Sequence, residues 1–216
     1  MIKPFRFDDL FKINSGANIS VENDCLIIDN FFLNYDMVLD YVYNNNVEIW
    51  KHTPNGKNFT DYYDCRHAIQ TWWDDTSTFD RQIIKVIKYY YHMDVLQSKK
   101  IFEFNYFKHL KMGVSNDYQH HPHVDVDFNL LVYLDEQSNG GTAIYNTEKH
   151  IENNEADNLL YDVSGLDKTI IQAKPNRCVI FNGNQYHGGH IDNHDVYYDN
   201  WRINLVRFYE RILPRS

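Results

Sequence analysis

From residue 101 onward, the chain consists mainly of short strand-like runs separated by turn residues. Such runs, rich in β-branched and aromatic residues and bounded by Gly, Pro, Asn and Asp, are typical of strands in an all-β layer. The 17 tyrosines and 13 phenylalanines of the chain favour the same interpretation, because aromatic side chains suit a half-buried pleated surface. We therefore predict a mainly β fold, with strands over 101–107, 127–134, 141–146, 168–173, 177–181 and 201–209.

Two helices are predicted before these strands. Residues 35–45 follow Asn34, a residue suited to cap a helix, and residues 77–91 place apolar side chains at helical spacing. Helices followed by many short strands predict an α+β arrangement, in which a β-barrel or sandwich carries helices on one face. Residues 46–76 show no such periodicity and are interpreted as irregular.

Length and composition favour one domain over 1–216. We interpret 1–100 as a helical and aromatic support region and 101–210 as the β core. The net charge of −9 makes nucleic acid an unlikely partner, since that binding depends on basic residues. No apolar run has the length of a membrane span or of a signal peptide, and the three cysteines show no zinc spacing. These features favour a cytoplasmic protein without membrane contact; the oligomeric state is not predicted.

The residues that point to chemistry are histidines spaced one residue from an acid. His123 and Asp125 have this spacing, and so do the pairs at 92/94 and 190/192. Only His123 and Asp125 lead directly into an alternating strand, and a later strand, 177–181, is followed by His187 after a short turn. Two imidazoles and one carboxylate can hold Fe(II) on one face and leave other positions open. We therefore predict His123, Asp125 and His187 as metal ligands.

Several alternatives remain open at this stage. His190 is the main rival of His187, and His120 and His121 are interpreted as solvated or as neighbours of the ligands. His121 or Asp127 would be a ligand if the site were a metal-dependent cupin. A non-catalytic β-sandwich with a tyrosine-rich surface would hold no metal.

Strand alternation predicts that Arg202 points into a cavity. Arg202 shares one face of its strand with Asn204, while Ile203 and Leu205 share the apolar face. Tyr133 lies on the mixed face of the strand over 126–134 and is expected to look into the same cavity. A buried guanidinium needs an anion, and a carboxylate can accept two of its N–H groups.

The order of motifs PH-x-D, YLD, NGGT, P-x-R-x-VIF, HGG and R-x-NLV resembles the 2-oxoglutarate/Fe(II)-dependent oxygenases, in particular their prolyl-hydroxylase-like branch. The resemblance covers about 101–210. It implies a double-stranded β-helix (a jelly roll, cupin-like) with the N-terminal helices packed on its larger sheet. It also implies that Arg202 and Tyr133 bind the distal carboxylate of 2-oxoglutarate, and that Tyr106 belongs to the cofactor pocket. Asn204 stands where many family members carry Ser or Thr.

The activity implied by the resemblance is that of a dioxygenase with Fe(II) as metal and with 2-oxoglutarate and O2 as co-substrates. The outcome would be hydroxylation of a small-molecule or protein side-chain substrate, with release of succinate and CO2. The substrate itself is not readable. The long polar segment 147–168 is interpreted as a lid or binding loop, because loops of that length in compact domains are usually functional.

Overall fold

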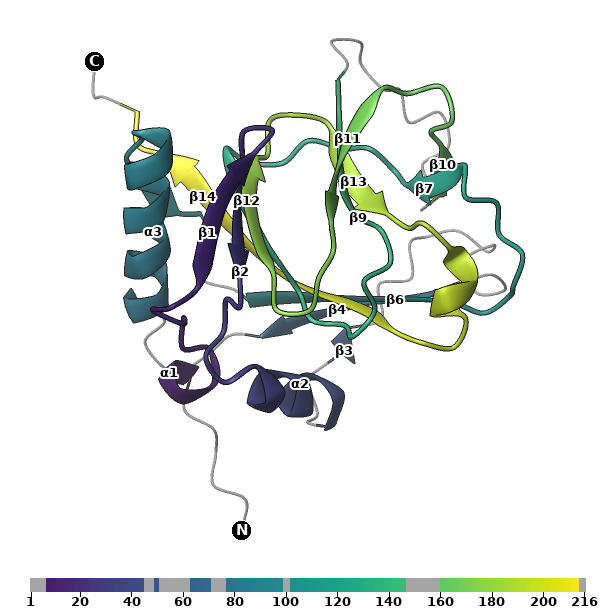
Figure 1. The fold of residues 1–216 in the computed structure, drawn as a ribbon, viewed down its shortest axis with the longest axis horizontal. Coiled ribbons are helices and arrows are strands. Elements are labelled where there is room, and N and C mark those ends of the chain that lie inside the picture. The colour runs from purple at the N-terminus through teal and green to yellow at the C-terminus, as the bar shows by residue number, and fades with distance from the viewer. Residues whose placement is uncertain are drawn as a thin grey trace.

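A computed structural model describes residues 7–44, 49–50, 63–70, 77–98, 102–146 and 160–213. The described chain is mainly β, with one large and two small sheets (Figure 1). The neighbours in the large sheet pair antiparallel. Its strands are, in spatial order, β1 (Asn18–Glu22), β2 (Cys25–Asp29), β12 (Cys178–Asn182), β8 (Phe128–Tyr133), β14 (Arg202–Arg211), β6 (Phe102–His109), β4 (Tyr63–Gln70) and β3 (Ile49–Trp50), with β5 (Val95–Gln97) paired to β14.

Two small sheets lie beside the large sheet (Figure 1). In one of them, β9 (Gly141–Tyr145) lies between β11 (Lys168–Gln172) and β13 (His187–His190). In the other, β7 (Tyr118–His120) pairs with β10 (Leu160–Asp162). A short 3-10 helix, η1 (His194–Tyr197), connects β13 to β14.

The helices are α1 (Phe7–Leu10), α2 (Tyr35–Asn44) and α3 (Ser77–Tyr91). The prediction of helices over 35–45 and 77–91 is confirmed. Their apolar faces are buried, as shown for α3 by Phe79, Ile83 and Ile87, which are at most 2% exposed. Figure 1 shows α2 and α3 on the outer side of the large sheet, away from β9, β11 and β13.

Strand β8 has one face packed toward the helices and the other face toward a cavity. Phe128, Leu130 and Val132 belong to one buried apolar cluster with side chains of α2 and α3. The residues between them, Asn129 and Leu131, line a cavity on the opposite face. The period-2 alternation read from the sequence therefore assigns both faces of this strand correctly.

The interpretation of 46–76 as irregular was wrong for part of the segment. Strand β4 runs for eight residues and pairs with β6 over its whole length, and β3 pairs with β4. The sequence of β4, YDCRHAIQ, has neither an apolar run nor a strict alternation. Pairing with a long neighbouring strand, which no local pattern reports, places these residues in the sheet.

Two other predictions concerned the division of the chain at residue 100 and the segment 147–168. Strands β1 to β4 precede residue 100 and lie in the same sheet as β6, β8, β12 and β14, so the sheet is continuous across the predicted division at 100. Of the segment 147–168, residues 147–159 lie outside the described chain, and 160–162 form β10. Within the described ranges, no helix is long and apolar enough to cross a bilayer.

Candidate functional site

Three predicted ligands meet at one point of the structure. The ligand atoms of His123, Asp125 and His187 all lie within 4.8 Å of one another. The Asp125 Oδ2 atom is 3.2 Å from His187 Nε2 and 3.6 Å from His123 Nε2. Two imidazole nitrogens and one carboxylate oxygen form the donor set that suits Fe(II) in facial sites.

The backbone holds the two imidazoles next to each other. His123 and His187 form an antiparallel bridge in which each backbone N–H donates to the other's carbonyl at 2.9 Å. The Nδ1 atom of His123 lies 2.9 Å from the His121 carbonyl, and that of His187 lies 2.8 Å from the Gln185 carbonyl. A carbonyl can only accept, so each Nδ1 carries a proton, and each Nε2 faces the Asp125 carboxylate, where it can bind a metal once it carries no proton of its own.

Asp125 is held in its charged form. Burial alone would raise its pKa, but hydrogen bonds from His123 and His187 bring the pKa well below the usual range of a carboxyl. Its backbone N–H donates to the Gly183 carbonyl at 2.8 Å, which anchors the segment before β8 to the turn after β12. Metal binding requires a deprotonated carboxylate, and this environment provides one.

The cluster opens into a cavity of about 310 Å³ between the large sheet and the small sheets. This volume is at the lower end of the range of about 300–1,000 Å³ that is typical of small-molecule sites. The wall is mixed, with polar side chains from several strands beside aromatic and aliphatic ones. The large sheet contributes Glu103, Asn105, Tyr106, Phe107, Asn129, Leu131, Phe181, Arg202, Asn204, Val206 and Phe208, and the small sheets contribute His120, Thr142, His187, Gly188 and Gly189.

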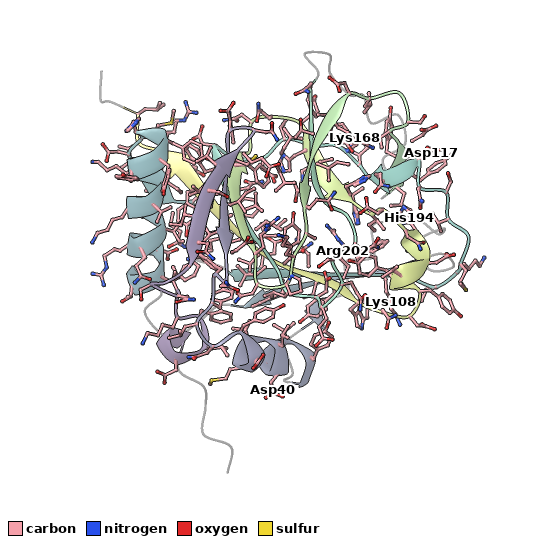
Figure 2. All side chains as sticks on the ribbon, viewed as in Figure 1. Asp40, Lys108, Asp117, Lys168, His194 and Arg202 are labelled. Carbon is pink, nitrogen blue, oxygen red and sulfur yellow. The ribbon has the colours of Figure 1, made fainter. Side chains whose placement is uncertain are left out.

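Arg202 lies at the interior of this cavity and is 4% exposed. Figure 2 shows it inside the molecule, whereas Asp40 lies on the outer edge. The guanidinium donates from Nη2 to the Gly141 carbonyl at 2.8 Å, and its Nε is buried without a hydrogen-bond partner. The strand-face prediction for Arg202 is confirmed, and its unpaired Nε is available to an anion.

Two glycines of the motifs allow chain segments to approach closely, and one of them makes room for this arginine. A Cβ on Gly189 would come within 2.8 Å of Arg202 Nη1 and 2.9 Å of the His120 ring. Gly140 has φ +85° and lies so close to β13 that a Cβ would collide with the His190 carbonyl at 2.1 Å. Both positions therefore require glycine for close approach of chain segments, beyond the role of a simple turn.

The two tyrosines occupy different positions. Tyr133 is fully buried, and its hydroxyl lies 2.7 Å from Thr142 Oγ1, which lines the cavity. Burial raises the pKa of Tyr133 to about 12, so it stays protonated and can donate. Tyr106 belongs to the apolar cluster on the helical side, and its hydroxyl donates to the Val42 carbonyl of α2 at 3.1 Å. Tyr106 is among the residues that line the cavity, but its hydroxyl is directed away from it toward α2.

The rival ligands lie elsewhere. His190 points to the other face of β13 and pairs with Asp192 at 3.2 Å. Asp127 accepts from the Arg211 backbone and from Asn184, so it does not join the His/Asp/His group. His120 lines the cavity, and burial followed by the neighbouring charge of Arg202 keeps its pKa well below the usual value, so its ring is neutral.

Sequence reasoning did not name four polar residues of the cavity wall. They are Glu103, Asn105, Asn129 and Thr142. The signal for Asn129 was present, because it lies on the mixed face of β8, four residues after Asp125. Asn105 could be placed only once the register of β6 against β14 was known, where it faces Asn204.

Comparison with known proteins gives matches in structure alone. No family model and no curated protein matches the sequence. The α-ketoglutarate-dependent non-haem epimerase SnoN from nogalamycin biosynthesis aligns with 87% of this chain and 76% of its own, with a TM-score of 0.51 and 11% identity. The carbocyclase SnoK from the same biosynthesis, also non-haem and α-ketoglutarate dependent, aligns with 86% and 79%, with a TM-score of 0.50 and 10% identity.

The chain shares the fold of these two enzymes. A Pseudomonas putida prolyl-4-hydroxylase also aligns, with 95% of this chain and 97% of its own, at a TM-score of 0.47 and 11% identity. At this level of identity the likeness describes the arrangement of the chain, and the chemistry must be argued from the site itself.

Proposed function

We propose that the protein is an Fe(II)- and 2-oxoglutarate-dependent oxygenase with the double-stranded β-helix fold, its helices packed on the larger sheet. The observation that supports this most is the pairing of two features in one cavity. His123, Asp125 and His187 bring an N2O donor set together, and Arg202 lies in the same cavity with a buried, unpaired Nε. One feature fits a facial metal ion and the other fits the carboxylate of a chelating co-substrate.

The residues present fit both groups. The two Nε2 atoms and the Asp125 carboxylate would hold iron, which supplies activation of O2 when bound. Arg202 would hold the distal carboxylate of 2-oxoglutarate, with Thr142 and His120 as polar neighbours on the wall. Phe107, Leu131 and Val206 form an apolar part of the cavity wall.

The overall reaction balances as substrate C–H, O2 and 2-oxoglutarate giving C–OH, succinate and CO2. One oxygen atom enters the product and the other enters succinate. The protein's part is to orient the two substrates and shield the metal. Hydroxylation of a small molecule or protein side chain is the outcome we propose, in a cytoplasmic setting.

A metal-dependent cupin without 2-oxoglutarate is less well supported. It would use His121 or Asp127, and neither joins the three-residue cluster. It would also leave the buried Arg202 without an anion. A non-catalytic binding module would give no role to the His/Asp/His cluster or to Arg202. The experiment below distinguishes such a module from an oxygenase.

Succinate formation tests the proposal. Anaerobic protein is loaded with Fe(II) and 2-oxoglutarate, exposed to O2 and analysed for succinate, and binding of both is followed by the charge-transfer absorption expected of the complex. We expect absorption and slow succinate release in the wild type. His187→Ala should lose both, whereas His190→Ala should keep both, because His190 pairs with Asp192 outside the cluster. Wild-type protein that binds neither Fe(II) nor 2-oxoglutarate would reject the proposal.

A further inference from the structure

Asn129 is a buried amide in direct contact with two of the three candidate ligands. Its side chain is on the cavity face of β8, and the residue is 2% exposed. The Nδ2 atom donates to Asp125 Oδ2 at 2.7 Å and lies 3.1 Å from His187 Nε2. Among the residues that the structure describes, no other side-chain amide has a recorded hydrogen bond to these ligands.

Asn129 donates to the Asp125 oxygen that faces the two imidazoles. Asp125 Oδ2 is the carboxylate atom nearest to both imidazoles, at 3.2 and 3.6 Å. A carboxylate on a short side chain can rotate about its terminal bond, and a second N–H donor fixes that rotation. An oxygen with two acceptor sites can keep a hydrogen bond from an amide while it binds a metal.

The position of Asn129 leaves one orientation of its amide. With Nδ2 toward Asp125, the Oδ1 atom is directed into a buried region and has no hydrogen-bond partner. It sits where a Cβ on Gly183 would come within 2.8 Å, so glycine at 183 makes the space for it. The reverse orientation would place a carbonyl oxygen against a carboxylate. An unsatisfied buried carbonyl costs free energy, which indicates that the bond to Asp125 is retained for the site.

We propose that Asn129 is a positioning residue of the metal centre, which fixes the Asp125 carboxylate toward the two imidazoles. This inference rests on the proposed metal site and adds a residue to it. Partners that orient a metal ligand typically change metal affinity by about 10- to 100-fold when they are removed.

The test compares Asn129→Leu with Asn204→Leu by anaerobic titration with Co(II), followed by visible absorption and calorimetry, without 2-oxoglutarate. Leucine has nearly the shape of asparagine but cannot donate. We expect Asn129→Leu to bind Co(II) about 10- to 100-fold more weakly, with an altered absorption spectrum. Asn204 is the matched control, because it is a buried amide on the same cavity wall with no recorded contact to the ligands; its variant should bind Co(II) as the wild type does.

The outcomes separate this inference from the proposed function. Wild-type protein that fails to bind Co(II) or Fe(II) would reject the metal site itself. Normal or tighter binding by Asn129→Leu, in a wild type that binds, would overturn the role of Asn129 alone. If Asn129→Leu does not fold, Asn129→Asp keeps the shape and replaces the donor with a carboxylate. We expect an altered Co(II) spectrum, and a spectrum and affinity identical to the wild type would contradict the proposal.

Discussion

Two arginines on one strand experience opposite environments. Arg202 and Arg207 both lie on β14 and are both buried, at 4% and 0% exposure. They are five residues apart, an odd number, so they point to opposite faces of the sheet. One faces the cavity, and the other faces the helices.

The protein neutralises only one of these charges with a direct ion pair. Arg207 donates from Nε and Nη2 to the two carboxylate oxygens of Asp80 on α3, at 3.2 and 2.7 Å. Tyr209 adds a hydrogen bond to the same carboxylate at 3.0 Å. The recorded hydrogen bond of Arg202 is to a neutral carbonyl. A buried arginine that is bidentate to a carboxylate is a structural element, whereas Arg202, whose Nε has no hydrogen-bond partner, has a donor left for an anionic ligand.

The largest expected effect is on the helical face. Asp80→Ala should lower the free energy of unfolding by about 3–5 kcal/mol, because it leaves the Arg207 guanidinium buried without its partner. Chemical denaturation at neutral pH measures this. The double variant Asp80→Ala/Arg207→Met should recover part of the loss, and a single variant as stable as the wild type would break the distinction between the two arginines.

Arg202→Ala should act on ligand binding instead. We expect 2-oxoglutarate affinity to fall by at least tenfold, within the roughly 2–5 kcal/mol typical of truncating one partner of a buried charged pair. Iron binding should stay near normal, and stability without ligand should change less than in Asp80→Ala. Titration of the anaerobic Fe(II) protein with 2-oxoglutarate is the measurement.

Arg202→Lys provides the control, since it restores the charge without the planar fork and should recover affinity in part. An unchanged titration in Arg202→Ala would contradict the assignment. Neither Arg177 nor Arg207 would be a ready alternative for binding the co-substrate. Arg177 is bidentate to Asp29 at 2.6 and 2.9 Å, and Arg207 is bidentate to Asp80.

Asp135 should give the cavity side a dependence on pH. Burial raises its pKa to about 6, against an ordinary carboxyl value near 4, although Arg202 opposes the shift. The folded protein then holds a proton that the unfolded chain has released. This contribution to the free energy of unfolding is fully present below about pH 4 and is lost as the pH rises through about 6. Its size is up to about 3 kcal/mol.

Unfolding of the wild type and of Asp135→Asn at pH 5 and pH 7 tests this. The wild type should lose more stability than the variant between these values, because the variant has no carboxyl to titrate at this position. Parallel losses in the two proteins would show that Asp135 has an ordinary pKa.

The smallest effect is expected for Tyr133→Phe. The hydroxyl bonds to Thr142, which lines the cavity, so Tyr133 acts on the cavity through Thr142. Loss of one neutral hydrogen bond should cost about 0.5–1.5 kcal/mol of stability. The affinity for 2-oxoglutarate should fall less than in Arg202→Ala. An equal or larger fall would place the Tyr133 hydroxyl on the ligand itself.

Local sequence patterns were sufficient to predict which side chains are buried and which face of a strand they occupy. The period of α3 and the alternation of β8 and β14 are properties of neighbouring residues, so the sequence predicted which side chains would be buried and that Arg202 would face a cavity. The His-x-Asp spacing placed two ligands because the segment leads directly into a strand. The choice of His187 over His190 followed from its place just after the predicted strand over 177–181.

What remained depended on contacts between segments far apart in the chain. Strand β4 was missed because its pairing with β6 is specified by the partner. Tyr106 was predicted in the cofactor pocket and lines the cavity, but that its hydroxyl bonds to α2 was not readable from the sequence. Asn129 was visible as a polar residue, but its contact with Asp125 and His187 required β8 and β13 to be placed in space. The sequence by itself determined the side-chain types and the face of each strand they occupy, because backbone geometry repeats every two residues. The tertiary structure alone decided which of those faces meet, because that depends on strand order and register across more than fifty residues of chain.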